Sequence, residues 1–308
     1  SDNYCAFSFT TSAGQYRVDW GDGNVTLHNS GTIAQYQYNY ATVSNSTISS
    51  RGYKQVMVKV TAVSGNLLTG NFQERFVTTP VQNQAYSSGF LECILSMPNA
   101  SSGLSIAFGG GTVRHAYCEK VEIKTIGNAT NIQYMFAGCN SLQLVPLFNT
   151  SNVIIMVGMF SGCNSLQSVP LFNTSNVTSM LFMFYNCYSL KSIPLFNTIK
   201  VTNMSVMLAS CFSINFIPTF ITTAVTTDFT LFANGCSSLN RILMSFNRTV
   251  SLQNCQLSKD ALVEIFTNLV DRTATTSANI DITGNWGSSA LTASDRLIAT
   301  NKNWVITG

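Results

Sequence analysis

Charged residues are scarce in this chain. Asp, Glu, Lys and Arg make up 9% of its 308 residues, against roughly 25% in an average soluble protein. The net charge is +3 and the basic residues form no cluster, so the sequence lacks the concentrated basic surface that nucleic-acid binding requires. No acidic residue occurs from Ile123 to Thr227. We therefore expect no nucleic-acid partner, and a surface whose polarity comes mainly from Asn, Ser and Thr.

Long apolar runs are also missing. A membrane-spanning helix needs ~20 consecutive apolar residues, and the longest apolar run here, around 153–160, is far shorter. The first residues, SDNYCAFSF, have neither the charged nor the hydrophobic region of a signal peptide. We expect no membrane insertion, and we expect the chain to be a mature product or a fragment of a longer protein.

The residues and motifs that carry most catalytic chemistry are few. The two histidines, His28 and His115, lie in different segments, and no C-x-x-C, G-x-G-x-x-G, P-loop or G-x-S-x-G motif occurs. Gly109-Gly110-Gly111 has no lysine after it, which favours a loop over a phosphate site. We predict no catalytic, cofactor or metal-binding residues.

Two groups of acidic residues offer alternatives to that prediction. Asp19 and Asp22 flank Trp20 and could bind calcium, but two carboxylates are too few for its six to eight oxygen ligands; we favour turn formation. A glycosidase needs two facing carboxylates, which could come only from residues such as Glu119, Glu122 or Asp228. We favour exposed surface positions for these acids as well.

The strongest positive signal is an internal repeat of 24 residues. The segments MFAGCNSLQLVPLFNTSNVIIMVG (135–158) and MFSGCNSLQSVPLFNTSNVTSMLF (159–182) agree at 18 of 24 positions. Copies follow at 183–206 and 207–230, and a fifth at 231–254 has slipped by one residue. One short strand per copy can pair only with the same strand of the next copy. The repeat therefore predicts parallel coils stacked at ~4.8 Å per copy.

Each copy contains the pattern L-x-x-V-x-L, as in Leu142, Val145 and Leu147. The last two positions alternate, which is the period of a β-strand. Pro146 and its equivalents cannot donate to a ladder, so we expect short, interrupted strands. The interior should hold the repeated apolar positions, among them Leu142, Leu166, Leu190, Val169, Met159 and Phe160.

The pattern MFxxCxSLxxxPxFNTSNVTxM, over about 128–254, resembles the BspA-like leucine-rich repeats. Such repeats occur in bacterial surface proteins and, in this Asn/Thr-rich form, in predicted virion proteins of tailed phages. The common bacterial form has Asp-Leu-Ser in the strand, where this chain has Val-Pro-Leu-Phe. That departure favours the phage-type branch.

The two ends differ from the repeats. Residues 1–63 show strand-like alternation at 7–9, 16–20, 36–40 and 54–61. Their VDWGDG turn and VMVKV segment resemble the polycystic-kidney-disease type of immunoglobulin-like domain, a module that spaces or presents other domains. Residues 64–127 are expected to be a junction with irregular first coils and strands at 91–95, 104–108 and 121–125.

Residues 255–308 are expected to cap the stack. Ser258 and Thr292 are predicted to begin two helices, and strands are predicted at 280–282 and 304–306. The predicted fold class is therefore mainly β: a small immunoglobulin-like β-sandwich, a leucine-rich-repeat-type solenoid of 24-residue coils over 128–254, and a helix-containing C-terminal cap.

The chain has nine cysteines, and the repeat places four of them, Cys139, Cys163, Cys187 and Cys211, at equivalent positions. We predict a buried row of reduced thiols, because cysteine can replace asparagine in leucine-rich coils as a small, weak donor to backbone carbonyls. Disulfides between adjacent coils are the alternative, since stacking at ~4.8 Å brings the Cα atoms within bonding range.

Functionally, we expect a non-enzymatic protein that recognises a partner. The exposed positions of the strand motif change between copies while the interior hardly does. This predicted face comprises Gln143, Leu144, Gln167, Ser168, Lys191, Ser192, Asn215 and Phe216. We expect a phage virion surface protein, either tail-fibre or adhesin-like or a capsid decoration, that binds a host-surface protein or glycan or another virion protein. A bacterial cell-surface adhesin and a purely structural spacer are the alternatives.

Overall fold

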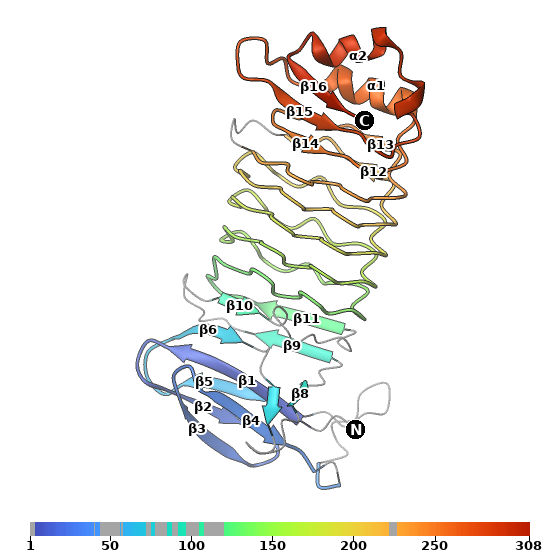
Figure 1. Cartoon of the computed structure of the whole chain (residues 1–308). Helices are drawn as coiled ribbons and strands as arrows, with labels where there is room; N and C mark the ends of the chain where they lie inside the picture. Colours follow the sequence, from blue (N-terminus) through green and yellow to red (C-terminus); the bar gives the residue numbers. More distant parts are fainter. Residues whose placement is uncertain are drawn as a thin grey trace.

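The structure is a computed structural model that describes residues 4–39, 41–43, 56, 58–71, 75–77, 85–87, 92–96, 105–107, 120–221 and 227–308. It is mainly β, with two α-helices near the C-terminus. A domain of antiparallel strands lies at the N-terminal end, a stack of coils follows, and the helices cover the C-terminal end (Figure 1). The mainly β class predicted from the sequence is confirmed.

Two sheets share one core in the N-terminal domain. One has the order β10-β6-β1-β4 and the other β3-β2-β5. Trp20 and Tyr16 are fully buried between them, and Trp20 stacks on Tyr36 with ring centroids 4.9 Å apart. The strands are β1 (Tyr4–Thr11), β2 (Gln15–Asp19), β3 (Val25–Asn29), β4 (Ile33–Gln37), β5 (Lys59–Ala62), β6 (Leu67–Asn71) and β10 (Ser105–Ala107).

The sequence anticipated β1, β2, β4 and β5 in part and missed β3 and β6. Of the strand predicted at 54–61, residues 54, 55 and 57 lie outside the described residues.

At the junction, β9 (Glu92–Ser96) pairs in parallel with β11 (Lys120–Thr125), and β7 (Arg75–Val77) pairs with β8 (Ala85–Ser87). The strands predicted at 91–95, 104–108 and 121–125 are confirmed over 92–95, 105–107 and 121–125. Residues 91, 104 and 108, like His115, Cys118 and Glu119, lie outside the described residues.

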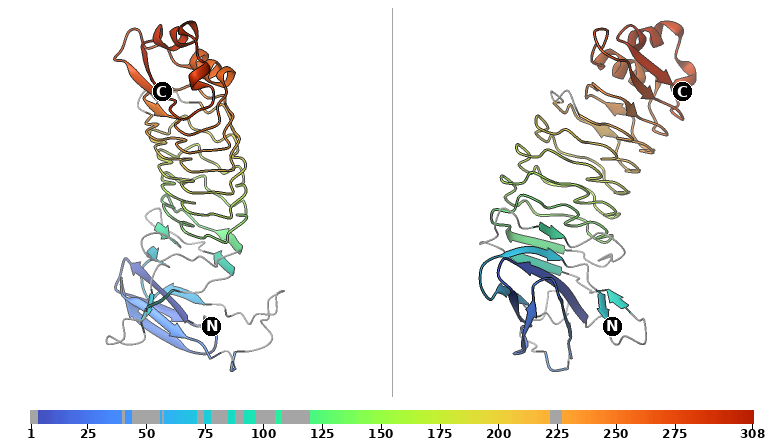
Figure 2. Two further views of the ribbon diagram at one scale, coloured as in Figure 1. Left: turned by 45° about the vertical axis from the view of Figure 1, so that its right-hand side comes forward. Right: turned by 60° about the vertical axis from the view of Figure 1, so that its left-hand side comes forward.

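Beyond β11 the chain winds into coils that stack in parallel (Figures 1 and 2). Single β-bridges join equivalent residues of successive coils, running from Asn131 to Ile155, Ser179, Asn203 and Asp228. Backbone hydrogen bonds between residues of successive repeats also link the coils at several other points of the perimeter. Each coil therefore depends on its neighbours for its hydrogen bonds, which explains why the repeats must fold as a stack.

The interior consists of columns of identical or similar side chains. Phe136, Phe160 and Phe184 stack with centroids 5.5 and 5.6 Å apart, and each is fully buried. The residues placed in the interior by the sequence pattern are buried too: Leu142, Leu166, Leu190, Val169, Met159, Phe160 and the four repeat cysteines are 0–7% exposed.

One leucine of the repeat lies on the surface, contrary to its strand-like alternation. Leu147, Leu171 and Leu195 are 65%, 59% and 59% exposed. In the second and third copies the N–H of the following phenylalanine donates to the carbonyl of the preceding proline, as in Phe172 to Pro170 (2.9 Å). This three-residue turn bends the chain, so the phenylalanine enters the core and the leucine points outward. Regular pairing at the motif is accordingly limited to the two-residue strands β12 (Phe216–Ile217) and β13 (Arg241–Ile242).

Side-chain donors reinforce the stack from inside. In five coils the thiol of the inward cysteine donates to a backbone carbonyl of the preceding coil, at 3.0–3.3 Å. The acceptor is always the residue three positions before that coil's own cysteine. The pairs are Cys163 to Phe136, Cys187 to Phe160, Cys211 to Phe184, Cys236 to Leu208 and Cys255 to Ala233. Threonines do the same toward the following coil. Thr150, Thr174 and Thr198 are 1% exposed and donate to carbonyls of that coil at 2.7–2.9 Å.

We expect thiol titration to confirm reduced cysteines. Burial raises the pKa of Cys5 and of Cys255 to about 12 and raises that of Cys187 well above its usual value. The reactive thiolate is thereby suppressed. Native protein should react slowly with a thiol reagent, whereas denatured protein without reductant should show most of its nine cysteines. A count near one in denaturant would instead show that the cysteines form disulfides.

The C-terminal cap continues the columns and then closes them. Asn285 takes the cysteine position and donates to the Leu252 carbonyl, three residues before Cys255. The parallel sheet β14 (Val250–Ser251), β15 (Ala278–Asp281) and β16 (Trp304–Thr307) ends the stack. Beside it lie α1 (Lys259–Asn268), the short 3₁₀ helix η2 (Ser288–Ala290) and α2 (Ala293–Thr300).

Both predicted helix starts are confirmed. Ser258 accepts from the N–H of Ala261, and Thr292 forms a capping box with Asp295. Within the part of the chain that is described, neither helix has the length and apolar character to cross a bilayer.

Candidate functional site

The predicted face is an outward strip of the coils. Gln143, Gln167, Lys191 and Asn215 are exposed and stand at equivalent positions of four successive coils. Beside them, Ser168 is half-buried, Ser192 is exposed and Phe216 is 38% exposed. The structure therefore brings these residues together as two neighbouring columns.

Backbone hydrogen bonds fix the spacing of this strip. The N–H of Gln167 donates to the Gln143 carbonyl (3.2 Å), Lys191 to Gln167 (3.0 Å) and Asn240 to Asn215 (3.1 Å). The Lys191 ammonium also donates to the Gln167 amide oxygen at 3.2 Å. The side chains are thus presented on a rigid frame.

The strip is less polar than the sequence suggested. Leu144 is 64% exposed beside Gln143, and the outward leucines of the proline turn, such as Leu171, lie further along the same segment of the coil. In the first three copies the exposed Leu147, Leu171 and Leu195 therefore lie between a column of Gln or Lys and a column of exposed asparagines, which are Asn149, Asn173 and Asn197. Partner surfaces commonly have such an apolar centre with a polar rim.

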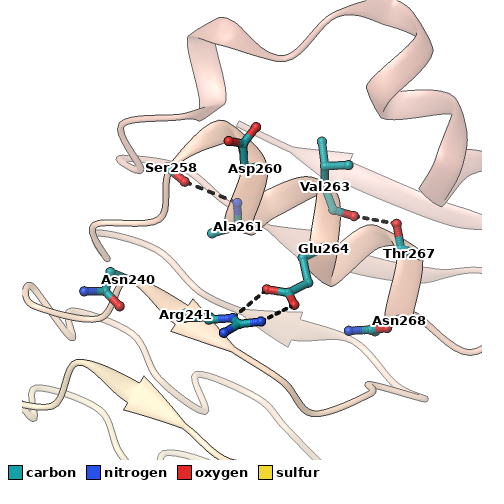
Figure 3. Close-up of a pocket in the computed structure, with 9 residues that line it drawn as sticks. All are labelled: Asn240, Arg241, Ser258, Asp260, Ala261, Val263, Glu264, Thr267 and Asn268. Carbon is teal, nitrogen blue, oxygen red and sulfur yellow. Dashed lines mark hydrogen bonds and ion pairs between the residues drawn. The ribbon is translucent and has the colours of Figure 1, made fainter.

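At its C-terminal end the strip meets helix α1 at a ledge (Figure 3). Asn240 and Arg241 continue the two columns, and Arg241 pairs in register with Phe216. The ledge is a shallow pocket of about 720 Å³, lined by Asn240, Arg241, Ser258, Asp260, Ala261, Val263, Glu264, Thr267 and Asn268.

An ion pair spans this ledge. The Arg241 guanidinium donates to both oxygens of Glu264, at 3.0 and 2.8 Å. Its hydrogen bonds hold the pKa of the Glu264 carboxyl below the usual value, and those same bonds raise the pKa of Arg241. The ledge thus presents an ionised acceptor beside a fixed donor, while their charges cancel.

A second groove lies elsewhere on the coils. Asn128, Asn152, Asn176 and Lys200 form an exposed column there, and the groove measures about 580 Å³. The Asn152 amide donates to Asn128 (3.2 Å), and Lys200 donates to Asn176 (2.8 Å). These side chains are largely engaged with one another along the stack.

The acidic residues considered as calcium ligands act as turn formers. Asp19 accepts from the N–H of Gly21 and Asp22 from the N–H of Asn24, each at 3.1 Å. Among the described residues, no group of three or more His, Cys, Asp or Glu side chains is arranged to hold a metal.

Sequence reasoning missed the ledge and several exposed aromatic residues. The fifth copy contains one extra residue after Ala233, and this insertion places Asn240 and Arg241 at the face positions. Tyr188 and Phe212 follow the repeat cysteines directly, where earlier copies have asparagine. Glu264 reaches the face only because α1 packs against β13, which no local pattern indicated.

Residues 112–220 and 169–261 match the family described as "Mycoplasma protein of unknown function, DUF285". The matches cover the coils and the start of the cap, and they support the resemblance to BspA-like repeats. No curated protein shows significant similarity to the chain.

Proposed function

We propose that the coils form a BspA-like leucine-rich solenoid, preceded by an immunoglobulin-like domain of the polycystic-kidney-disease type, and that the protein binds a surface partner without catalysing a reaction. The observation that most supports this proposal is the contrast between the inward and outward residues of the coils. Inward columns such as Phe136, Phe160 and Phe184 are constant and buried, whereas the outward column changes from Gln143 to Lys191 to Asn215. Folding requires the constant columns and leaves the outward strip available for recognition.

In this proposal the protein belongs to a virion surface, as a tail-fibre or adhesin-like component or a capsid decoration. Its partner is a host-surface protein or glycan, or a neighbouring virion protein. The Asn/Thr-rich repeat without acidic strand residues supports the virion assignment. The family match, whose description names Mycoplasma, favours the alternative of a bacterial cell-surface adhesin. A structural spacer would use the stack for its length alone.

A cell-retention experiment tests recognition. Purified protein is incubated with candidate bacterial hosts and with cultured animal cells, then washed at high salt. We expect retention on at least one cell type, because uncharged contacts resist screening. A variant with Gln143, Gln167, Lys191 and Asn215 changed to Ala should lose it.

The matched control changes Asn128, Asn152 and Asn176 to Ala in the second groove and should be retained like the parent. Equal retention of the two variants would contradict recognition through the predicted face. No retention on any cell would contradict binding to a host surface.

A further inference from the structure

Exposed aromatic residues gather along one corner of the coils. In two successive coils the residue that follows the inward cysteine is aromatic and exposed. Tyr188 and Phe212 are 39% and 44% exposed, and their rings are nearly parallel, at 8°, with centroids 4.9 Å apart. In the next coil this position holds Ser237, whose side chain is too small to cover the far face of the Phe212 ring.

A third aromatic residue stands further along the same corner. Asn285 occupies the cysteine position of the last coil, so Trp286 occupies the outward one, and it is 71% exposed. Phe212 and Trp286 are three coil steps apart, roughly 14 Å at the usual strand spacing. Ser237 and Gln256 lie between them. The corner therefore carries a row of four positions, Phe212, Ser237, Gln256 and Trp286, with an exposed aromatic residue at each end. We call it the aromatic row.

The aromatic row approaches the ledge at α1. The N–H of Gly287 donates to the Leu257 carbonyl at 2.9 Å, and a β-carbon at Gly287 would collide with the Lys259 backbone. This close approach places Trp286 near the helix start, where Ser258 and Asp260 line the ledge. The aromatic residues and the Arg241–Glu264 pair thus belong to one side of the molecule.

We propose that the aromatic row and the ledge together bind a neutral glycan. Pyranose rings have an apolar C–H face, which packs on exposed aromatic rings, and hydroxyl groups around their edge. The Glu264 carboxylate and Arg241 guanidinium offer an acceptor and a donor side by side, which matches adjacent hydroxyls. Ser237, Gln256 and Asn240 add uncharged partners.

The charges at the site argue for a neutral ligand. Arg241 is already paired with Glu264, and Asp260 adds a further negative charge at the ledge. An anionic ligand would face this uncompensated carboxylate. The core of a protein–protein interface is depleted of charged residues, whereas this ledge contains the Arg241–Glu264 pair and Asp260.

The protein contains its own probe for this site. Of its three tryptophans, Trp20 and Trp304 are 0% and 2% exposed, so quenching of fluorescence by acrylamide reports mainly on Trp286. Maltohexaose, cellohexaose, chitohexaose and mannohexaose are added separately at concentrations up to the millimolar range. We expect at least one of them to protect Trp286 from quenching in a saturable manner.

Phe212→Ala should weaken that binding about tenfold, which corresponds to ~1.4 kcal/mol for one lost ring contact. Arg241→Ala should weaken it by a similar factor. Val305→Ala removes an apolar side chain that is 49% exposed on β16 and belongs to neither the aromatic row nor the ledge, so this variant should bind like the parent. Circular dichroism verifies that all three variants fold. Protection by none of the four sugars, or protection unchanged in Phe212→Ala and Arg241→Ala, would overturn the proposal.

This inference deepens the proposed function, and the two fail separately. Cell retention that persists after periodate oxidation of surface glycans, without protection of Trp286 by any sugar, would overturn glycan binding and leave surface recognition standing. Protection of Trp286 without retention on any cell would support glycan binding and contradict the host-surface role.

Discussion

Leu166→Ala should destabilise the protein by about 2–5 kcal/mol, the usual cost of truncating a fully buried leucine. Leu166 is 0% exposed and lies in the middle of the stack. Its removal deletes contacts within its own coil and with both neighbouring coils. Because each coil is held in place by its hydrogen bonds to the next, the cavity cannot close by moving one coil alone. Urea-induced unfolding followed by circular dichroism measures the effect.

Leu171→Ala is the matched control, since it removes the same atoms from the same repeat. Leu171 is 59% exposed, so we expect a change within about 0.5 kcal/mol. Comparable losses for the two variants would contradict the assignment of inward and outward leucines. So would a negligible loss for Leu166→Ala.

The interior of the stack could be predicted from the sequence because its physical cause repeats every 24 residues. A buried position tolerates few side chains, so Leu142, Leu166 and Leu190 are identical, and identity at a fixed spacing is visible without a structure. The helix starts at Ser258 and Thr292 were equally visible, because capping depends on residues within one turn.

The outward leucines could not be predicted from periodicity, because a local bend overrides it. Leu171 and Leu195 follow a proline, and the turn after that proline reverses the side on which the next side chain emerges. The alternation rule holds for an extended chain and fails where the chain bends. The proline itself was recognised as an interruption, but its effect on the following leucine was not.

The ledge and the position of Trp286 beside it depend on contacts between segments far apart in the sequence. Glu264 meets Arg241 across 23 residues, and Trp286 reaches the start of α1 only because Gly287 allows a close approach. Neither contact has a local signature. In the candidate site, therefore, the columns supplied by the repeats were predictable and the side chains supplied by the cap were not.

A pair of deletions tests most directly whether the 24-residue coils stack in register. Removing residues 159–182 deletes one whole coil. Met156 donates to the Ser179 carbonyl in the parent and would then meet Asn203, the same position one coil later. Every remaining residue keeps its place relative to its neighbours, so the shortened stack should fold.

Removing residues 159–170 is the control, because it deletes half a coil. It would place Thr178 where Leu166 packs and Ser189 where Val177 packs, and both of those positions are fully buried. We expect the 24-residue deletion to give a soluble protein with one cooperative thermal transition and a parent-like circular dichroism spectrum. The 12-residue deletion should lose both the cooperative transition and the parent-like spectrum. Equal behaviour of the two deletions, or loss of folding in the 24-residue deletion alone, would contradict stacking in register.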